Sequence, residues 1–518
     1  MHTILSLLIV VLLSISCKTD KKESFVVLLP SDQEQIALAE TITEEELKTH
    51  LYTYASDDFE GRETGTEGQK KAINYLVSYY TSLGISMAQG TDNYLQKVPV
   101  IYTTAPNGSM STGGIEFEIG SDFVSFSAAT GSFDAVFVGY GIDTPEYSDY
   151  STLEVEGKLV IAMAGEPQNE DGTYTLTGTT SYSKWSNVSE ALTKRIEAAT
   201  SKGAEGLIYI DQDNFERYLR YYSYMKRNNS GQMRLEENTI FSAVLNPSKT
   251  KELLGAIDLA TPQSLQQSIQ LYIEGGSSPV DTENVVAIIE GIEKPDEYVI
   301  VSSHLDHIGI DAEGNVNNGA DDDGSGTVAM LEIAEALLKA KEQGKGPRRS
   351  VVFLHVTGEE KGLLGSEYYT DRAPLYPLEN TVTNLNIDMI GRIDPEREGA
   401  RNYIYLIGSD KLSSELHNLS EEVNAKFTQI ELDYTYNDEN DPNRFYYRSD
   451  HYNFAKNNIP IIFYFNGTHE DYHEHTDTPD KINYDLLTNR TRLVFHTLLE
   501  VANREEGPKV DKTASVSE

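Results

Sequence analysis

The chain of 518 residues carries 42 Lys plus Arg against 82 Asp plus Glu, which gives a formal charge of −40. This length allows roughly two to four domains and a sizeable hydrophobic core. The strong negative charge repels phosphate backbones, so it argues against nucleic-acid binding. A single cysteine, Cys17, excludes an internal disulfide and a thiolate cage, and any metal must be held by imidazole and carboxylate groups.

The N-terminus has the pattern of an export signal. Residues 4–13 form an apolar run too short to span a bilayer, and small residues lead from it to Cys17. The pattern resembles a bacterial lipoprotein signal, although the preceding residues contain His2 and no Lys or Arg. We expect residues 1–17 to be the signal, residues 18–42 a tether, and a lipidated Cys17 to hold an exported protein at the membrane of the cell envelope. The alternative is an uncleaved apolar N-terminus.

Two helices are predicted next. Thr43 to Glu46 form a capping box, and apolar residues recur at helical spacing from Ala72 to Leu83, before Gly84. Between the two helices, the glycines of residues 55–68 indicate a loop.

A smaller α/β unit follows from about residue 131. Residues 135–140, 159–163 and 206–210 have the composition of buried strands, and residues 192–199 have helical spacing. We expect this unit to have its own core.

Apolar strands return after residue 282, at residues 285–289 and 298–302, and alternate with helical segments such as 328–338. The pattern predicts an α/β fold with a mainly parallel-centred open sheet flanked by helices. Ligands of such sheets bind at the carboxyl ends of the strands.

Polar clusters gather at those strand ends. His304-Leu-Asp-His-Ile-Gly309 follows one strand, with Asp306 placed to orient His304. Gly319 to Gly326 hold three consecutive carboxylates in a turn before a helix, where repulsion is costly unless a cation offsets it. Capping of the helix would need only one of the three.

Three further clusters complete the set. Glu359 and Glu360 follow a strand and point in different directions, Asp388 has apolar neighbours, and His473 and His475 precede a helix. Each cluster alone has an ordinary structural explanation, and His355 fits a core position. Two His and three carboxylates from separate strand ends, with a spare glutamate, are the ligand set of a two-metal hydrolase. The mixed N/O donors suit Zn²⁺, with Mn²⁺ or Co²⁺ as substitutes.

The ordered motifs HLDHIG, GADDDGSG, TGEEKGLLGSEYY, NIDMIGR and YHEHTDTPDK resemble metallopeptidase family twenty-eight, the di-zinc leucyl-type aminopeptidase family, over residues 43–504. The unit from Phe133 resembles the protease-associated (PA) domain often inserted in these enzymes. By this resemblance residues 43–130 and 283–505 form the zinc peptidase domain, and residues 131–282 form the inserted domain. The polar tail, residues 506–518, is expected to be disordered.

The resemblance also implies roles for single residues. Two Zn²⁺ ions per chain would share Asp322, one bound by His304 and Asp388 and the other by Glu360 and His473. The spacing to Asp477 favours His473 over His475.

For catalysis, the resemblance makes Glu359 the general base for the attacking water and Tyr472 a donor to the oxyanion. It also implies a cis peptide bond before Asp323 and places Arg448 at the pocket.

The implied activity is removal of N-terminal residues from peptides. Glutaminyl cyclase or carboxypeptidase action on the same scaffold is the alternative, and Arg392 and Arg448 are candidates to bind a substrate carboxylate. A non-catalytic surface-binding protein is the third possibility. Side-chain preference and oligomeric state are left open.

Overall fold

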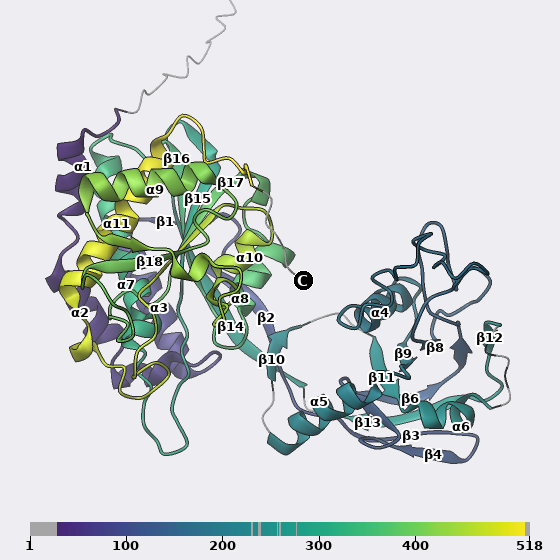
Figure 1. The fold of residues 1–518 in the computed structure, drawn as a ribbon. Helices are drawn as coiled ribbons and strands as arrows, with labels where there is room; N and C mark the ends of the chain where they lie inside the picture. The colour runs from purple at the N-terminus through teal and green to yellow at the C-terminus, as the bar shows by residue number, and fades with distance from the viewer. Residues whose placement is uncertain are drawn as a thin grey trace, which may run out of the picture.

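The computed structural model describes residues 28–228, 232–236, 240–255, 257, 259, 261–275 and 277–512. The predicted signal and Cys17 lie outside these residues. No helix in the described ranges has both the length and the apolar composition needed to cross a bilayer. The chain forms a large α/β domain and a smaller inserted unit, joined through strands β2, β10 and β14 (Figure 1).

Ten strands of the described chain form the large sheet, in the order β10-β2-β14-β16-β15-β17-β20-β18-β19, with β1 beside β14. The central strands β16, β15, β17 and β20 are parallel to one another, as predicted. The bounds are β1 (Ser86–Met87), β2 (Leu95–Thr103), β10 (Gln232–Leu235), β14 (Ser277–Ile289), β15 (Lys294–His304), β16 (Arg349–Val356), β17 (Thr381–Ile387), β18 (Tyr403–Ile407), β19 (Glu431–Asp433) and β20 (Ile461–Phe465).

Helices cover both faces of this sheet because the central strands are apolar on both sides. The larger layer holds α1 (Asp32–Ala39), α2 (Glu44–Tyr54), α3 (Glu67–Leu83), α7 (Gly326–Glu342), α9 (Ser414–Phe427) and α11 (Tyr484–Asn503). The other layer holds α8 (Leu364–Glu367), η4 (Tyr368–Arg372) and α10 (His451–Ala455).

The predicted helix boundaries follow from local chemistry. The Thr43 hydroxyl accepts the N–H of Glu46 at the start of α2, and Gly84 ends α3 in the left-handed conformation. The loop before α3 contains a short helical turn, η1 (Asp57–Arg62). A second turn, η3 (Ala320–Ser325), leads into α7.

The inserted unit has two sheets, in the orders β12-β7-β8-β9-β11-β5 and β4-β3-β13-β6, around one apolar core. Its strands are β3 (Asn107–Thr112), β4 (Ile115–Glu118), β5 (Phe123–Ser125), β6 (Ala129–Phe133), β7 (Ala135–Phe137), β8 (Leu159–Met163), β9 (Gly206–Ile210), β11 (Phe241–Leu245), β12 (Gln263–Ser264) and β13 (Ile269–Glu274). Its helices are α4 (Ala191–Ser201), α5 (Phe215–Asn228) and α6 (Thr250–Leu254).

The structure corrects four predicted segment boundaries. The inserted unit begins at β3 and not at residue 131, because β3, β4 and β5 pair within its sheets. It ends at β13 and not at residue 282, because β14 pairs with β2 in the large sheet from Ser277 onward.

The other two corrections concern the chain ends. The expected tether contains α1, whose Leu38 and Ala39 lie in the main core. Residues 506–512 of the expected tail are ordered, and the main-chain N–H groups of Asp511 and Lys512 both donate to the carbonyl of Leu412.

Candidate metal centre

Two neighbouring strand ends supply the first group of polar side chains. β15 ends at His304, and Asp388 follows β17 directly. The strands are parallel, with Ser302 opposite Asn386, so both side chains emerge at the same edge of the sheet. The Nε2 atom of His304 lies 3.6 Å from the Oδ1 atom of Asp388.

The middle carboxylate of the acidic turn faces this group. The Oδ1 atom of Asp322 lies 3.1 Å from Nε2 of His304, and its side chain is buried. The peptide bond between Asp322 and Asp323 is cis, as the resemblance implies.

The two flanking carboxylates are occupied by the main chain. Asp321 accepts the N–H of Gly391 at 2.6 Å. Asp323 also lies near His304, but its oxygens accept the main-chain N–H groups of Met389 and His304 at 3.1 and 3.3 Å. Asp323 still offers an oxygen near His304 and Asp388, but Asp322 is the one of the three whose two oxygens face both histidines, His304 and His473.

The second group lies on the other side of Asp322. Glu360 follows β16, and His473 comes from the loop before α11. The Nε2 atom of His473 lies 3.1 Å from Oδ2 of Asp322 and 3.2 Å from Oε2 of Glu360. His475 is exposed on the same loop. Asp322 thus offers one oxygen to each group.

His307 joins the second group although it was not among the predicted site residues. Its ring is buried, and its Nδ1 atom lies 2.9 Å from Oε1 of Glu360 and 3.8 Å from Oδ2 of Asp322. Its Nε2 atom is buried without a hydrogen-bond partner among the described residues. The sequence feature that could have identified His307 as a site residue is its position three residues after His304, at the end of the same strand.

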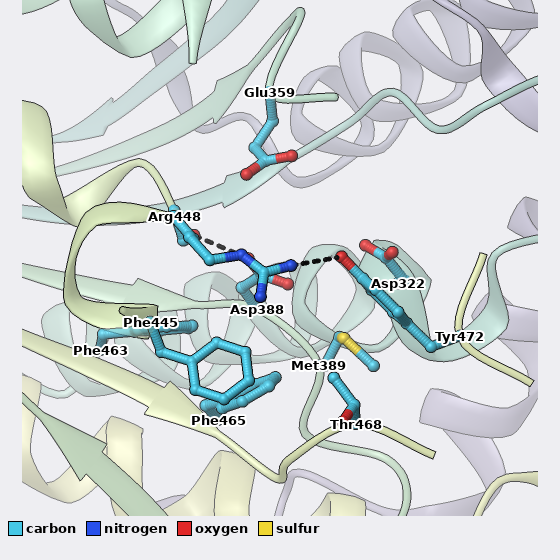
Figure 2. A pocket seen from close by; sticks show the side chains of 11 residues that line it. Asp322, Glu359, Asp388, Met389, Phe445, Arg448, Phe463, Phe465, Thr468 and Tyr472 are labelled. Carbon is cyan, nitrogen blue, oxygen red and sulfur yellow. Dashed lines mark hydrogen bonds between the residues drawn. The ribbon is translucent and has the colours of Figure 1, made fainter. Parts of the chain in front are cut away.

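Glu359 turns its carboxylate into the pocket shared with Asp322 and Asp388 (Figure 2). Burial raises the pKa of Glu359 well above its usual range, and neighbouring carboxylates act in the same direction, against the attraction of the His304 ring. A bound cation would lower this pKa.

Asp306 orients its neighbours in a way that differs from the prediction. The Nδ1 atom of His304 lies 3.0 Å from the main-chain oxygen of Asp306, not from its carboxylate. That carboxylate accepts the main-chain N–H of Glu359 at 3.2 Å and the hydroxyl of Thr64 at 2.8 Å. It therefore positions Glu359, while the main chain of the same residue positions His304.

The pocket beside this centre has a polar side and an apolar side. Arg448 crosses it, and its Nη2 atom donates to the Oη atom of Tyr472 at 3.4 Å (Figure 2). The Tyr472 ring stacks on the His473 ring, with centroids 3.9 Å apart. The apolar lining consists of Met389, Phe445, Phe463 and Phe465.

The donor set fits divalent cations. Four carboxylates converge here, those of Asp322, Glu359, Glu360 and Asp388, and among the described residues no Lys or Arg forms an ion pair with any of them. Carboxylates at such separations repel one another unless a cation offsets their charge. Imidazole nitrogens and carboxylate oxygens are ligands that Zn²⁺ accepts.

A family model described as Peptidase family M28 matches residues 284–498. These residues form a peptidase family M28 domain. The M28 domain contains every strand from β15 to β20 and all five predicted metal ligands, so the family resemblance is confirmed for this part of the chain.

Curated relatives match parts of the chain. A protein of Arabidopsis thaliana named "Probable glutamate carboxypeptidase LAMP1" is 37% identical over 106 residues, which cover 20% of this chain and 14% of that protein. Aminopeptidase Y of Saccharomyces cerevisiae is 27% identical over 270 residues, covering 50% of this chain and 45% of the relative. The chain thus spans less than half the length of either relative.

A solved structure of a zinc aminopeptidase from Bacillus subtilis aligns with 92% of this chain and 97% of its own, at 17% identity and a TM-score of 0.46.

Proposed function

We propose that the protein is a zinc-dependent aminopeptidase that removes N-terminal residues from peptides. The observation that carries this proposal is the position of Asp322, with one carboxylate oxygen toward His304 and the other toward His473 and Glu360. A shared carboxylate between two groups of ligands is the arrangement that a co-catalytic metal pair requires. The M28 match over residues 284–498 supports the same class of reaction.

Two Zn²⁺ ions would be held here, one by His304 and Asp388 and the other by Glu360 and His473, with Asp322 shared. Zinc at such a site polarises the scissile carbonyl and lowers the pKa of water to near neutrality. His307 either holds Glu360 in place or supplies a further ligand to the second ion.

The protein groups around the pocket perform the remaining steps. Glu359 takes the proton of the attacking water and passes it to the leaving amine. The hydroxyl of Tyr472 donates a hydrogen bond to the tetrahedral oxyanion. The carboxylates of the pocket attract the free amine of the substrate, and its first side chain packs against the apolar lining.

Carboxypeptidase action is the second candidate, because Arg448 faces the pocket. Among the described residues, Arg448 donates to Tyr472 and lies 5.0 Å from the centre of the Phe445 ring but forms no ion pair, so its charge is available to a substrate carboxylate. Arg392, by contrast, donates to Asp471 at 2.8 Å and is largely buried. Glutaminyl cyclisation remains the third candidate on the same scaffold.

The test is product release from zinc-loaded protein across four substrate types: aminoacyl-nitroanilides, their N-acetylated counterparts, peptides with a free C-terminal glutamate, and glutaminyl peptides. We expect cleavage of free-amine nitroanilides only. Chelation should abolish it, and Glu359→Gln should lower kcat about 10³-fold or more. The control is Glu379→Gln, an exposed carboxylate, which should match wild type. Cleavage of the C-terminal glutamate or cyclisation alone would replace the aminopeptidase proposal.

We also propose that the protein is an exported lipoprotein of the bacterial cell envelope, anchored through Cys17, and that the inserted unit is a PA domain that limits access to small peptides. The apolar run of residues 4–13 ahead of Cys17 supports the first proposal. The inserted unit has an independent core, as a separate domain does, and the resemblance of the segment from Phe133 to a PA domain supports the second proposal. Labelled palmitate should be incorporated into the wild type and not into Cys17→Ser.

A further inference from the structure

The inserted unit has a hollow of its own at the carboxyl ends of its parallel strands. Tyr140, Glu166 and Asp211 follow β7, β8 and β9 by one to three residues, and all three line it. Its volume is about 570 Å³, within the range of pockets that hold small ligands. In open parallel sheets this edge is where ligands bind.

Glu166 and Ser186 each place in this hollow a buried polar atom that lacks a partner among the described residues, and Glu166 is the charged one of the two. Its side chain is only 4% exposed, and its Oε1 atom accepts the main-chain N–H of Ser183 at 2.7 Å. Its Oε2 atom is buried and has no hydrogen-bond partner in the described part of the chain. Leaving a buried carboxylate oxygen unpaired is costly, so a ligand that donates hydrogen bonds to it would stabilise the folded unit.

The neighbouring charges do not satisfy this oxygen. Among the described residues, the guanidinium of the buried Arg195 donates to main-chain carbonyls, including those of the lining residues Tyr140 and Gly165. The Oδ1 and Oδ2 atoms of Asp211 both accept the amide of Asn214. Glu166 therefore keeps an acceptor that no protein cation uses.

The other lining groups favour a cation. Two further carboxylates line the hollow, those of Asp211 and Asp213, and no Lys, Arg or His among the described residues does so. The aromatic lining residues are Tyr140, Tyr174 and Tyr209, of which Tyr209 already has the Arg195 guanidinium over its ring at 5.1 Å, so Tyr140 and Tyr174 are the rings left for a ligand. Carboxylates and aromatic faces together attract ammonium and guanidinium groups.

The spacing argues against a metal ion. In the described chain, the groups of three His, Cys, Asp or Glu ligand atoms that lie within 4.8 Å of one another are both in the candidate metal centre. We propose that the hollow binds the basic side chain of a peptide, with Glu166 as the counter-ion of its ammonium or guanidinium group. The proposal goes beyond the proposed aminopeptidase function and does not depend on it.

The test is calorimetric titration of the full chain with Nα-acetyl-lysine amide, a probe that has a side-chain ammonium and a blocked amino terminus. Nα-acetyl-norleucine amide, which has a similar shape and no charge, is the matched probe. We expect saturable binding of the lysine probe with one site per chain, and no saturable binding of the norleucine probe.

Two variants assign the site. Glu166→Gln keeps an acceptor for Ser183 and should weaken the lysine probe about tenfold or more, whereas Glu170→Gln, an exposed neighbour, should change it less than about twofold. Asp213→Asn, at an exposed lining position, should also weaken binding of the lysine probe. It provides the test if Glu166→Gln destabilises the protein and so lowers its thermal midpoint. Leucyl-nitroanilide cleavage should stay unchanged in all three, which separates this result from the test of catalysis.

The proposal is overturned if the norleucine probe binds as tightly as the lysine probe, or if Glu166→Gln and Asp213→Asn both leave the affinity for the lysine probe unchanged. It is also overturned if the lysine probe shows no saturation up to about 10 mM, because a specific site should bind more tightly than that.

Discussion

Identical side chains in the acidic turn have different surroundings, and those surroundings separate their roles. Asp321 and Asp323 accept main-chain N–H groups, which fixes the turn, while Asp322 faces the two histidines. The sequence indicates that a cation offsets the triplet but does not distinguish its members by spacing. Only the family resemblance selects Asp322, because the hydrogen-bond donors come from segments that are distant in the chain.

His307 shows where residue-level prediction stopped short. The sequence places it three residues after His304, yet nothing local indicates that its ring turns toward Glu360, since that contact depends on how β15 and β16 are aligned. The expected contact between the Asp306 carboxylate and His304 failed for a related reason. The main-chain carbonyl occupies that position instead.

The first prediction concerns His307→Gln. The substitution removes the imidazole beside Glu360, so we expect zinc affinity to fall about 10- to 100-fold while the fold is retained. Competition with a fluorescent zinc chelator measures the affinity. His475→Gln, at an exposed position on the loop that carries His473, is the control and should bind zinc as the wild type does. Equal affinity in both variants would remove His307 from the metal centre.

At the scale of elements, apolar runs predicted the central strands and α7 because burial on both faces leaves a strong compositional signal. The same reasoning placed the start of the inserted unit at residue 131, too late in the chain. β3, with the sequence Asn-Gly-Ser-Met-Ser-Thr, buries little besides Met110 and Thr112. A strand that is polar on one face and rich in small residues on the other gives almost no periodic signal.

The loop predicted at residues 55–68 serves as a support for the metal centre. Arg62 of η1 is 1% exposed, and its guanidinium donates to the carbonyls of Tyr54, Asn318 and Gly319 at 2.7 to 3.1 Å. The last two carbonyls immediately precede η3, which carries Asp322. Arg62 therefore ties the N-terminal helices to the acidic turn.

The second prediction follows from this contact. Arg62→Met leaves buried carbonyls unpaired, so we expect the free energy of unfolding to fall by about 3 kcal/mol. Urea denaturation measures the change. Arg401→Met is the control because Arg401 forms an exposed ion pair with Asp485, and its loss should cost less than about 1 kcal/mol. Similar losses in the two variants would contradict the proposed support.

At the scale of the whole molecule, buried histidines should limit stability in acid. Burial lowers the pKa of His355 and of His451 to about 3 and that of His496 to about 4. These rings stay neutral when folded but gain a proton below about pH 6.5 when unfolded. The free energy of unfolding is therefore unaffected by these rings above that pH. It decreases as the pH falls from about 6.5 toward the folded pKa values, because only the unfolded chain gains the protons.

The third prediction quantifies this loss. When the pH is lowered from 7.5 to 5.5, each of these histidines should lower the free energy of unfolding by about 1.4 kcal/mol. His496 stacks on Phe427 with centroids 4.1 Å apart, so His496→Phe keeps the ring contact and should reduce the pH-dependent loss by about that amount. Urea denaturation of chelated protein at the two pH values measures it, with exposed His475→Phe as the control. An unchanged pH dependence in His496→Phe would show that this ring is not the source.

The paired metal centre is tested most directly by anomalous X-ray diffraction at the zinc edge from crystals grown with zinc. We predict two peaks on opposite sides of the Asp322 carboxylate, one beside His304 and Asp388 and the other beside Glu360 and His473. A single peak, or two peaks that do not share Asp322, would contradict the account of a co-catalytic pair.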